Sequence, residues 1–163
     1  MTTCQTITLD YDDEMKSTRK LLERVLLDEA HRGYKPHEKS MPLEILATHV
    51  AQLPSWPKMA LASETFELEP GFEPPIATST AELLDLFDKS VEEGRESLQR
   101  ATDAEMQKDW TFKFGELSST QVRTKVIRSF INHLVHHRAQ LGVYLRLNGI
   151  AIPGMYGPSA DEN

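Results

Sequence analysis

The sequence predicts an all-α fold, a four-helix bundle that forms a single domain over residues 1–163. Four segments carry apolar residues in alternating steps of three and four, the spacing that places side chains on one face of an α-helix. A long irregular connection separates the second segment from the third. Four amphipathic segments with a long crossover describe a four-helix bundle, and this chain length suits one domain.

The first helix is expected roughly from Asp10 to Ala30, where the apolar spacing is regular. Its inward positions are Tyr11, Met15, Thr18, Leu22 and Val25. The polar stretch of residues 31–39 follows, and it contains glycine and proline, which end helices. Cys4, the only cysteine, is expected to be exposed in a frayed terminus, and one thiol excludes disulfides and cysteine-rich metal sites.

The second helix is expected to begin at Ser40 and to run to about Leu53, with a proline in its first turn. Leu46, His49 and Leu53 keep the same spacing, so His49 takes an inward position. Two prolines that follow Leu53 are expected to end or kink this helix.

Residues 64–78 are rich in proline and glutamate and are expected to form an irregular crossover. The third helix is expected to begin at the capping box of residues 79–82 and to fade near Thr102. Its inward positions are Leu84, Phe87, Val91, Gly94, Leu98 and Ala101. The small residues Gly94 and Ala101 would allow a neighbouring segment to approach closely.

Residues 110–115 alternate large apolar and polar side chains, which is the spacing of a β-strand. Isolated strands are rarely stable, so an extended loop whose aromatic side packs on a helix is expected instead. A capping box at residues 118–121 predicts the start of the fourth helix, which ends between Asn148 and Gly149. The tail from Ile150 onward is expected to be irregular.

Two histidines lie on the inward face predicted for the fourth helix. Its stripe is Val126, Phe130, His133, His137, Gln140 and Tyr144. Burying an imidazole without a partner costs on the order of 1–3 kcal/mol, so two imidazoles one turn apart need a reason. A bound metal ion is the obvious candidate, because side chains four residues apart on a helix can share one ion.

His49 on the second helix can supply a third nitrogen. Three neutral imidazoles with open coordination positions are typical of a catalytic site, since structural zinc normally has four protein ligands. This donor set, without thiolates, suits Zn, Ni, Fe or Co. A histidine pair at this spacing is more often solvated than metal-bound, but the apolar positions of all three residues favour a metal site. A haem with two histidine ligands stays an alternative.

The other histidines are expected to lie outside this site. His136 points about 100° away from His137 around the helix axis, and His31 and His37 fall in a loop. Leu134 stands where a zinc protease has its catalytic glutamate, and the sequence contains no Glu-x-x-His pattern for a di-iron centre.

Charge and hydropathy argue against two classes of partner. The formal net charge is −7 and no basic patch is visible, so a nucleic-acid partner is not expected. No run of about 18 apolar residues occurs, so membrane insertion is not expected either. The first residues have neither a basic nor an apolar leader segment, which favours the cytoplasm.

Two segments carry a resemblance to a known family. They are residues 46–54, Leu-Ala-Thr-His-Val-Ala-Gln-Leu-Pro, and residues 132–141, Asn-His-Leu-Val-His-His-Arg-Ala-Gln-Leu. With the tail Pro-Gly-Met-Tyr-Gly-Pro of residues 153–158, they make the whole chain resemble the DinB/YfiT-like metalloenzymes. The resemblance implies an up-down-down-up helix order, a homodimer, and one divalent metal ion held by His49, His133 and His137.

Relatives in that family include isomerases and S-transferases that use the low-molecular-weight thiols mycothiol or bacillithiol. One hypothesis is therefore a metal-dependent transferase or hydrolase, in which the ion activates a thiol or water towards a small-molecule ligand. The other hypothesis is a metal-binding stress-response protein without turnover. Open coordination positions favour the first, and a fourth protein ligand favours the second. Trp56, Trp110 and Tyr156 are candidates for the pocket rim, although surface packing explains each of them equally well.

Overall fold

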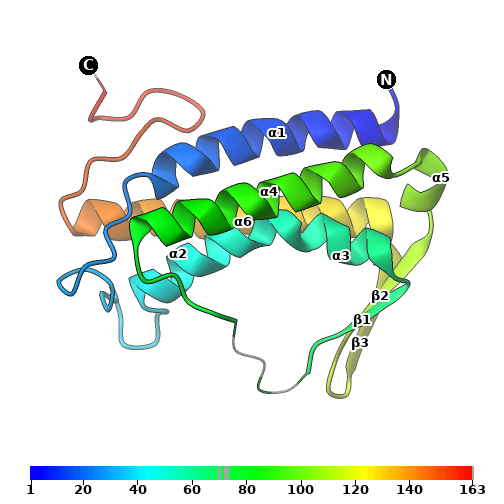
Figure 1. The fold of residues 1–163 in the computed structure, drawn as a ribbon, viewed down its shortest axis with the longest axis horizontal. Coiled ribbons are helices and arrows are strands. Elements are labelled where there is room, and N and C mark those ends of the chain that lie inside the picture. The colour runs from blue at the N-terminus through cyan, green and yellow to red at the C-terminus, as the bar shows by residue number, and fades with distance from the viewer. Residues whose placement is uncertain (70, 72–73, 163) are drawn as a thin grey trace.

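A computed structural model describes residues 1–69, 71 and 74–162, and a bundle of long helical segments dominates it. The segments are α1 (Thr3–Leu22), the consecutive α2 (Leu43–Gln52), η1 (Leu53–Ser55) and α3 (Trp56–Ala62), α4 (Thr80–Arg100), and α6 (Arg123–Leu147). In Figure 1, α1 and α6 run in one direction, and α2–α3 and α4 run in the other. This arrangement has the up-down-down-up order that the resemblance implies. None of these described helices combines the length and apolarity needed to cross a membrane.

Helix α1 begins and ends earlier than the sequence predicts. The Thr2 side chain accepts a hydrogen bond from the Gln5 backbone N–H, and the Gln5 side chain accepts one from the Thr2 backbone, which makes a capping box. The Cys4 backbone N–H donates to Asp103 at 3.0 Å. The prediction of a frayed, exposed Cys4 was therefore wrong, because the capped first turn buries this side chain, which is 7% exposed. Burial and the nearby Asp103 raise the pKa of its thiol to about 11.

The second helical segment changes direction at its prolines, as expected. Helix α2 passes into the 3-10 turn η1, which contains Pro54, and α3 then begins with Trp56 and Pro57. Pro54 and Pro57 are both buried. The segment therefore stays inside the bundle while its axis bends.

A small sheet corrects the prediction of an all-α protein. Strand β2 (Asp109–Phe114) pairs antiparallel with β3 (Leu117–Val122) and parallel with β1 (Thr65–Glu67), which lies in the predicted crossover. Gly115 has a φ of 54° in the hairpin turn, a conformation that suits glycine.

The strand-like spacing of residues 110–115 thus has partners, and the prediction of a loop was wrong. The partner β3 comes from residues 117–122, which were assigned to the start of a helix. Three crossover residues, 70, 72 and 73, lie outside the described residues.

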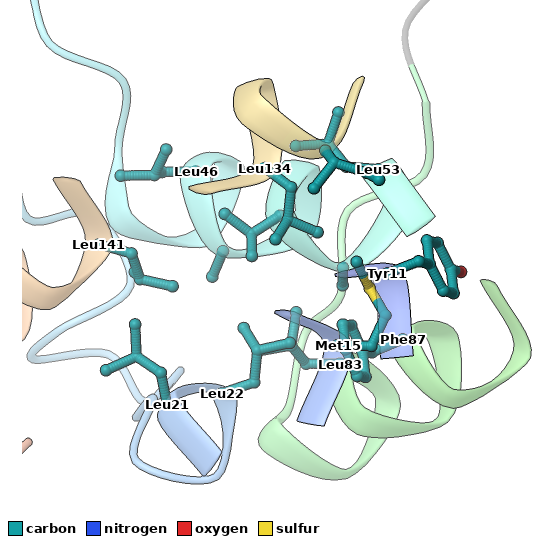
Figure 2. Close-up of a cluster of buried hydrophobic side chains, with 14 of the residues drawn as sticks. Tyr11, Met15, Leu21, Leu22, Leu46, Leu53, Leu83, Phe87, Leu134 and Leu141 are labelled. Carbon is teal, nitrogen blue, oxygen red and sulfur yellow. The ribbon is translucent and has the colours of Figure 1, made fainter. Parts of the chain in front are cut away.

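The core lies between α1, α2, α4 and α6, where Figure 2 shows side chains from all of these helices meeting. Every inward position predicted for the first helix is buried. On α4, Phe87, Gly94 and Leu98 are buried as predicted. On α6 a row of buried positions lies beside the predicted stripe, and it consists of Ile127, Ile131, Leu134, Arg138, Leu141 and Leu145. Val126 and Tyr144 of the predicted stripe are also buried. His133 and His137 are therefore half-buried at the edge of the core, where a ligand can reach them.

Candidate metal site

Two neighbouring helices bring the three predicted histidines together. His49 lies in the last turn of α2, and His133 and His137 lie one turn apart on α6, which packs against α2. One ring nitrogen from each residue lies within 4.8 Å of the other two. The ring centroids are 4.5 Å apart for His133 and His137, 4.8 Å for His49 and His137, and 5.3 Å for His49 and His133.

The spacing of the nitrogens fits coordination of one ion. The Nε2 atoms of His49 and His133 are 3.1 Å apart. Two nitrogens bound about 2.1 Å from one ion at a tetrahedral angle would lie about 3.4 Å apart. Among the residues that the structure describes, these three form the only His/Cys/Asp/Glu cluster of this kind, so the protein donors are three imidazoles. Such a donor set suits Zn, Ni, Fe or Co and leaves coordination positions open.

Burial keeps these imidazoles neutral, which metal binding requires. Desolvation is the largest cause that lowers the pKa of His49 to about 4, and the neighbouring His137 and His133 lower it further. Desolvation also lowers the pKa of His133 and of His137. At neutral pH the three rings therefore present lone pairs and bind a cation without first losing a proton.

Gln140 orients one of the three rings. The Nδ1 of His137 lies 2.8 Å from Oε1 of Gln140, one turn further along α6. The amide oxygen can only accept, so Nδ1–H donates and the lone pair is left on Nε2. The stripe prediction placed Gln140 inward, but its exposed side chain instead holds the His137 tautomer. The three-residue spacing from His137 was the sequence signal for this contact.

Aromatic side chains form one wall of the site. The Trp56 ring lies 5.8 Å from the His49 ring and 5.4 Å from the His133 ring. Phe130, one turn before His133, packs edge-on against Trp56 at 5.3 Å. These rings exclude water from one side of the histidines, which strengthens electrostatic interactions there.

The structure places the other two rim candidates away from the histidines. Trp110 is 3% exposed and contacts Phe130, so one ring separates it from the site. Tyr156 bonds to Glu14 and Arg138 on the α1 side of α6. Its contacts anchor the C-terminal tail. The packing explanation therefore holds for Trp110 and Tyr156, whereas Trp56 borders the triad.

The remaining histidines lie outside the triad, as predicted. His136 is exposed, and its ring lies 5.0 Å from that of His137. His31 pairs with Asp28 in the connection after α1. His37 accepts a hydrogen bond from the Lys39 backbone in the same connection.

Two hollows flank the triad. A groove of about 370 Å³ runs along α2 and is lined by Met41, Ile45, Thr48, His49, Gln52, Pro74 and Ile76. A second hollow of about 250 Å³ lies at the hairpin and is lined by Trp56, Trp110, Phe112, Ser119, Gln121, Val126, Ser129 and Phe130. Only the first of these two contains a histidine of the triad in its lining.

Comparison with known proteins agrees with this fold. The chain matches the DinB family over residues 5–163. A DinB-like protein from Bacillus cereus ATCC 10987 has a TM-score of 0.71 at 19% identity, with 93% of this chain and 97% of that chain covered. A DinB-like protein from Bacillus subtilis has a TM-score of 0.69 at 19% identity, with 94% and 99% covered. At this identity the structural likeness shows the fold alone. No curated protein matches the chain.

Proposed function

Since the chain belongs to the DinB family, we propose that it binds one divalent metal ion through His49, His133 and His137 and acts as a metal-dependent enzyme. The observation that carries this proposal is the convergence of three half-buried imidazoles within 4.8 Å. Leucine side chains would fill these three positions without the cost of desolvating a polar ring, so packing alone does not explain three neutral imidazoles. Zn, Ni and Fe are the ions that we propose for the site.

The residues around the triad have separable roles in this proposal. When bound, the ion would act as a Lewis acid and lower the pKa of a coordinated thiol or water. The three histidines hold the ion, Gln140 keeps the His137 tautomer that presents Nε2, and Trp56 with Phe130 shields one side from water. The acceptor of the nucleophile would be a small molecule in one of the two flanking hollows.

A thiol S-transferase is the reaction that we favour, with mycothiol or bacillithiol as the class of thiol, since the resemblance implies it. A hydrolase would use the same ion with water in place of the thiol. The alternative is a metal-binding stress-response protein without turnover. The three-ligand donor set among the described residues favours an enzyme, because a structural site normally closes with a fourth protein ligand.

Metal content tests the site directly. We expect about one divalent ion per chain in the purified protein and a large loss in His137→Ala. The matched control is His136→Ala, which removes an exposed imidazole from the adjacent position of the same helix and should keep the ion. Elemental analysis of the three proteins after dialysis measures the difference. Equal metal in His137→Ala and wild type would refute the proposed ligand set.

Spectroscopy separates the enzyme from the alternative. Protein loaded with Co(II) or Ni(II) and titrated with a low-molecular-weight thiol should develop a thiolate charge-transfer band, since coordination deprotonates a thiol. A loaded protein whose spectrum ignores thiols and small anions such as azide would have a closed site. That result would favour metal binding without turnover.

We also propose that the protein is cytoplasmic and that it forms a homodimer; the homodimer rests on the family resemblance. Light scattering at micromolar concentration should give twice the mass of 18.5 kDa. A monomer mass under these conditions would contradict the homodimer. The net charge of −7 supports small molecules rather than nucleic acid as partners.

A further inference from the structure

We propose that the groove along α2 binds the apolar tail of a ligand whose anionic head coordinates the metal ion. The proposal rests on the function proposed above and adds the class of ligand. That class is a small acid, thiol or hydroxamate with an uncharged alkyl or aromatic tail. The groove is defined by the seven lining residues given above, from Met41 to Ile76.

The groove leads directly to the triad. His49 belongs to its lining and is also one of the three converging imidazoles. Ile45, His49 and Gln52 lie at steps of four and three along one side of α2, and Met41 lies just before this helix. A head group bound beside His49 would therefore leave its tail lying along α2. The volume of about 370 Å³ falls in the range of pockets that bind small molecules.

Hydrogen bonds hold the outer wall of the groove in place. The Ala77 backbone N–H donates to Oγ1 of Thr48 at 3.1 Å, and both residues are buried. The Gln52 side-chain amide donates to the Pro75 carbonyl at 3.3 Å. These bonds fasten the described residues 74–77 to α2 from either side of His49. The groove is therefore formed before a ligand arrives, which lowers the entropy cost of binding.

The chemistry of the lining selects an uncharged tail. Met41, Ile45, Pro74 and Ile76 present apolar surface, and among the residues that the structure describes the lining contains no Lys, Arg, Asp or Glu. The Thr48 hydroxyl and the Gln52 amide already bond to the wall. A charged tail would lose its hydration here and would meet no opposite charge among these described residues. An apolar tail would gain about 25 cal/mol for each Å² that it buries.

The hairpin hollow is the competing location for the tail. Its lining has four aromatic rings but no histidine, and Trp56 stands between it and the triad. A tail from a head group at His49 would have to pass the Trp56 ring to enter it. The groove along α2 needs no such rearrangement.

A series of alkyl hydroxamates bound to the Co(II)-loaded protein tests the proposal, with the visible spectrum reporting binding to the ion. From acetohydroxamate to hexanohydroxamate, each methylene should tighten Kd about fourfold, which corresponds to ~0.8 kcal/mol. Ile45→Trp fills the groove, so it should keep the affinity for acetohydroxamate and lose the gain with chain length. Ser129→Trp, in the hairpin hollow, is the matched control and should behave as wild type.

The outcomes separate the two proposals. A Kd that does not change with chain length, while acetohydroxamate binds, would overturn the groove and leave the metal site standing. A chain-length gain lost in Ser129→Trp and kept in Ile45→Trp would also overturn it, because the tail would lie at the hairpin. Failure to take up Co(II), or a loaded ion that ignores acetohydroxamate, would remove the proposed function and the groove proposal with it.

Discussion

Replacing Gly94 with alanine should destabilise the protein, although the same change in an ordinary helix stabilises. A Cβ at Gly94 would lie 2.0 Å from the carbonyl oxygen of Pro54 and 2.6 Å from the hydroxyl of Tyr11. That hydroxyl donates to the Pro54 carbonyl at 2.9 Å and also reaches the Val91 carbonyl at 3.2 Å. The missing side chain of Gly94 therefore lets α4 meet η1 and Tyr11 at one buried point.

The magnitude follows from three terms. Alanine gains about 1 kcal/mol over glycine in a helix interior. Overpacking a core costs about 1–3 kcal/mol, and leaving a buried hydroxyl unsatisfied costs a further 1–3 kcal/mol or so. Because the contact with Pro54 involves backbone, the neighbour cannot rotate away. The expected net change is a loss of roughly 2–4 kcal/mol in the free energy of unfolding.

Gly142→Ala on α6 is the matched control, because a Cβ there meets nothing within 4 Å. This variant should gain about 0.5–1 kcal/mol. Urea unfolding measures both changes as shifts of the midpoint at constant m value. Gly94→Ala should also weaken metal binding, since Pro54 lies between His49 and Trp56 in the sequence and a shift of Pro54 would move both residues. A Gly94→Ala protein as stable as wild type would refute the close packing of α4 on η1.

Two further predictions concern charged groups in the bundle. For the metal-free protein, the pKa of His49 is lowered from 6.5 to about 4. The free energy of unfolding is therefore unaffected by this residue above pH 6.5, and it decreases as the pH falls towards 4, because the unfolded chain binds a proton that the folded protein does not. The loss in the free energy of unfolding should be ~2 kcal/mol after discounting for partial exposure. Urea midpoints between pH 7 and 4 measure it. An equally steep fall in stability with pH in His49→Gln would contradict the assignment of this loss to His49. Glu14→Ala should cost about 3 kcal/mol in urea unfolding, because it removes the carboxylate 2.7 Å from Arg138, which is 2% exposed. Arg138→Met should cost less, since the Glu14 carboxylate that it leaves is 19% exposed and still accepts a hydrogen bond from Tyr156. The reverse ranking would show that Arg138 does not need this partner.

Much of the bundle followed from side-chain spacing alone. Tyr11, Met15, Thr18 and Leu22 repeat at helical intervals and are buried on α1. Gly94 could be identified as a point of close approach because it stands among large residues on the inward stripe of α4. The triad could be predicted as well, since two histidines four residues apart lie on the same face of a helix. His49 lies at an inward position of the apolar spacing predicted for another helix. Local geometry decides these features, so the sequence contains them.

Only the tertiary structure decided the sheet, the burial of Cys4 and the orientation of the site. Residues 110–115 and 117–122 are each ambiguous alone, and they become strands because each satisfies the backbone hydrogen bonds of the other. Cys4 is buried where the first turn of α1 meets Asp103, a residue far along the chain that accepts a hydrogen bond from the Cys4 backbone N–H. The row of α6 that faces the core is Ile131, Leu134 and Arg138, which turns the histidines to the edge of the core. The groove beside His49 likewise exists because Thr48 binds Ala77 across the crossover. The contacts of Cys4 with Asp103 and of Thr48 with Ala77 join residues that lie far apart in the chain, so no local pattern specifies them.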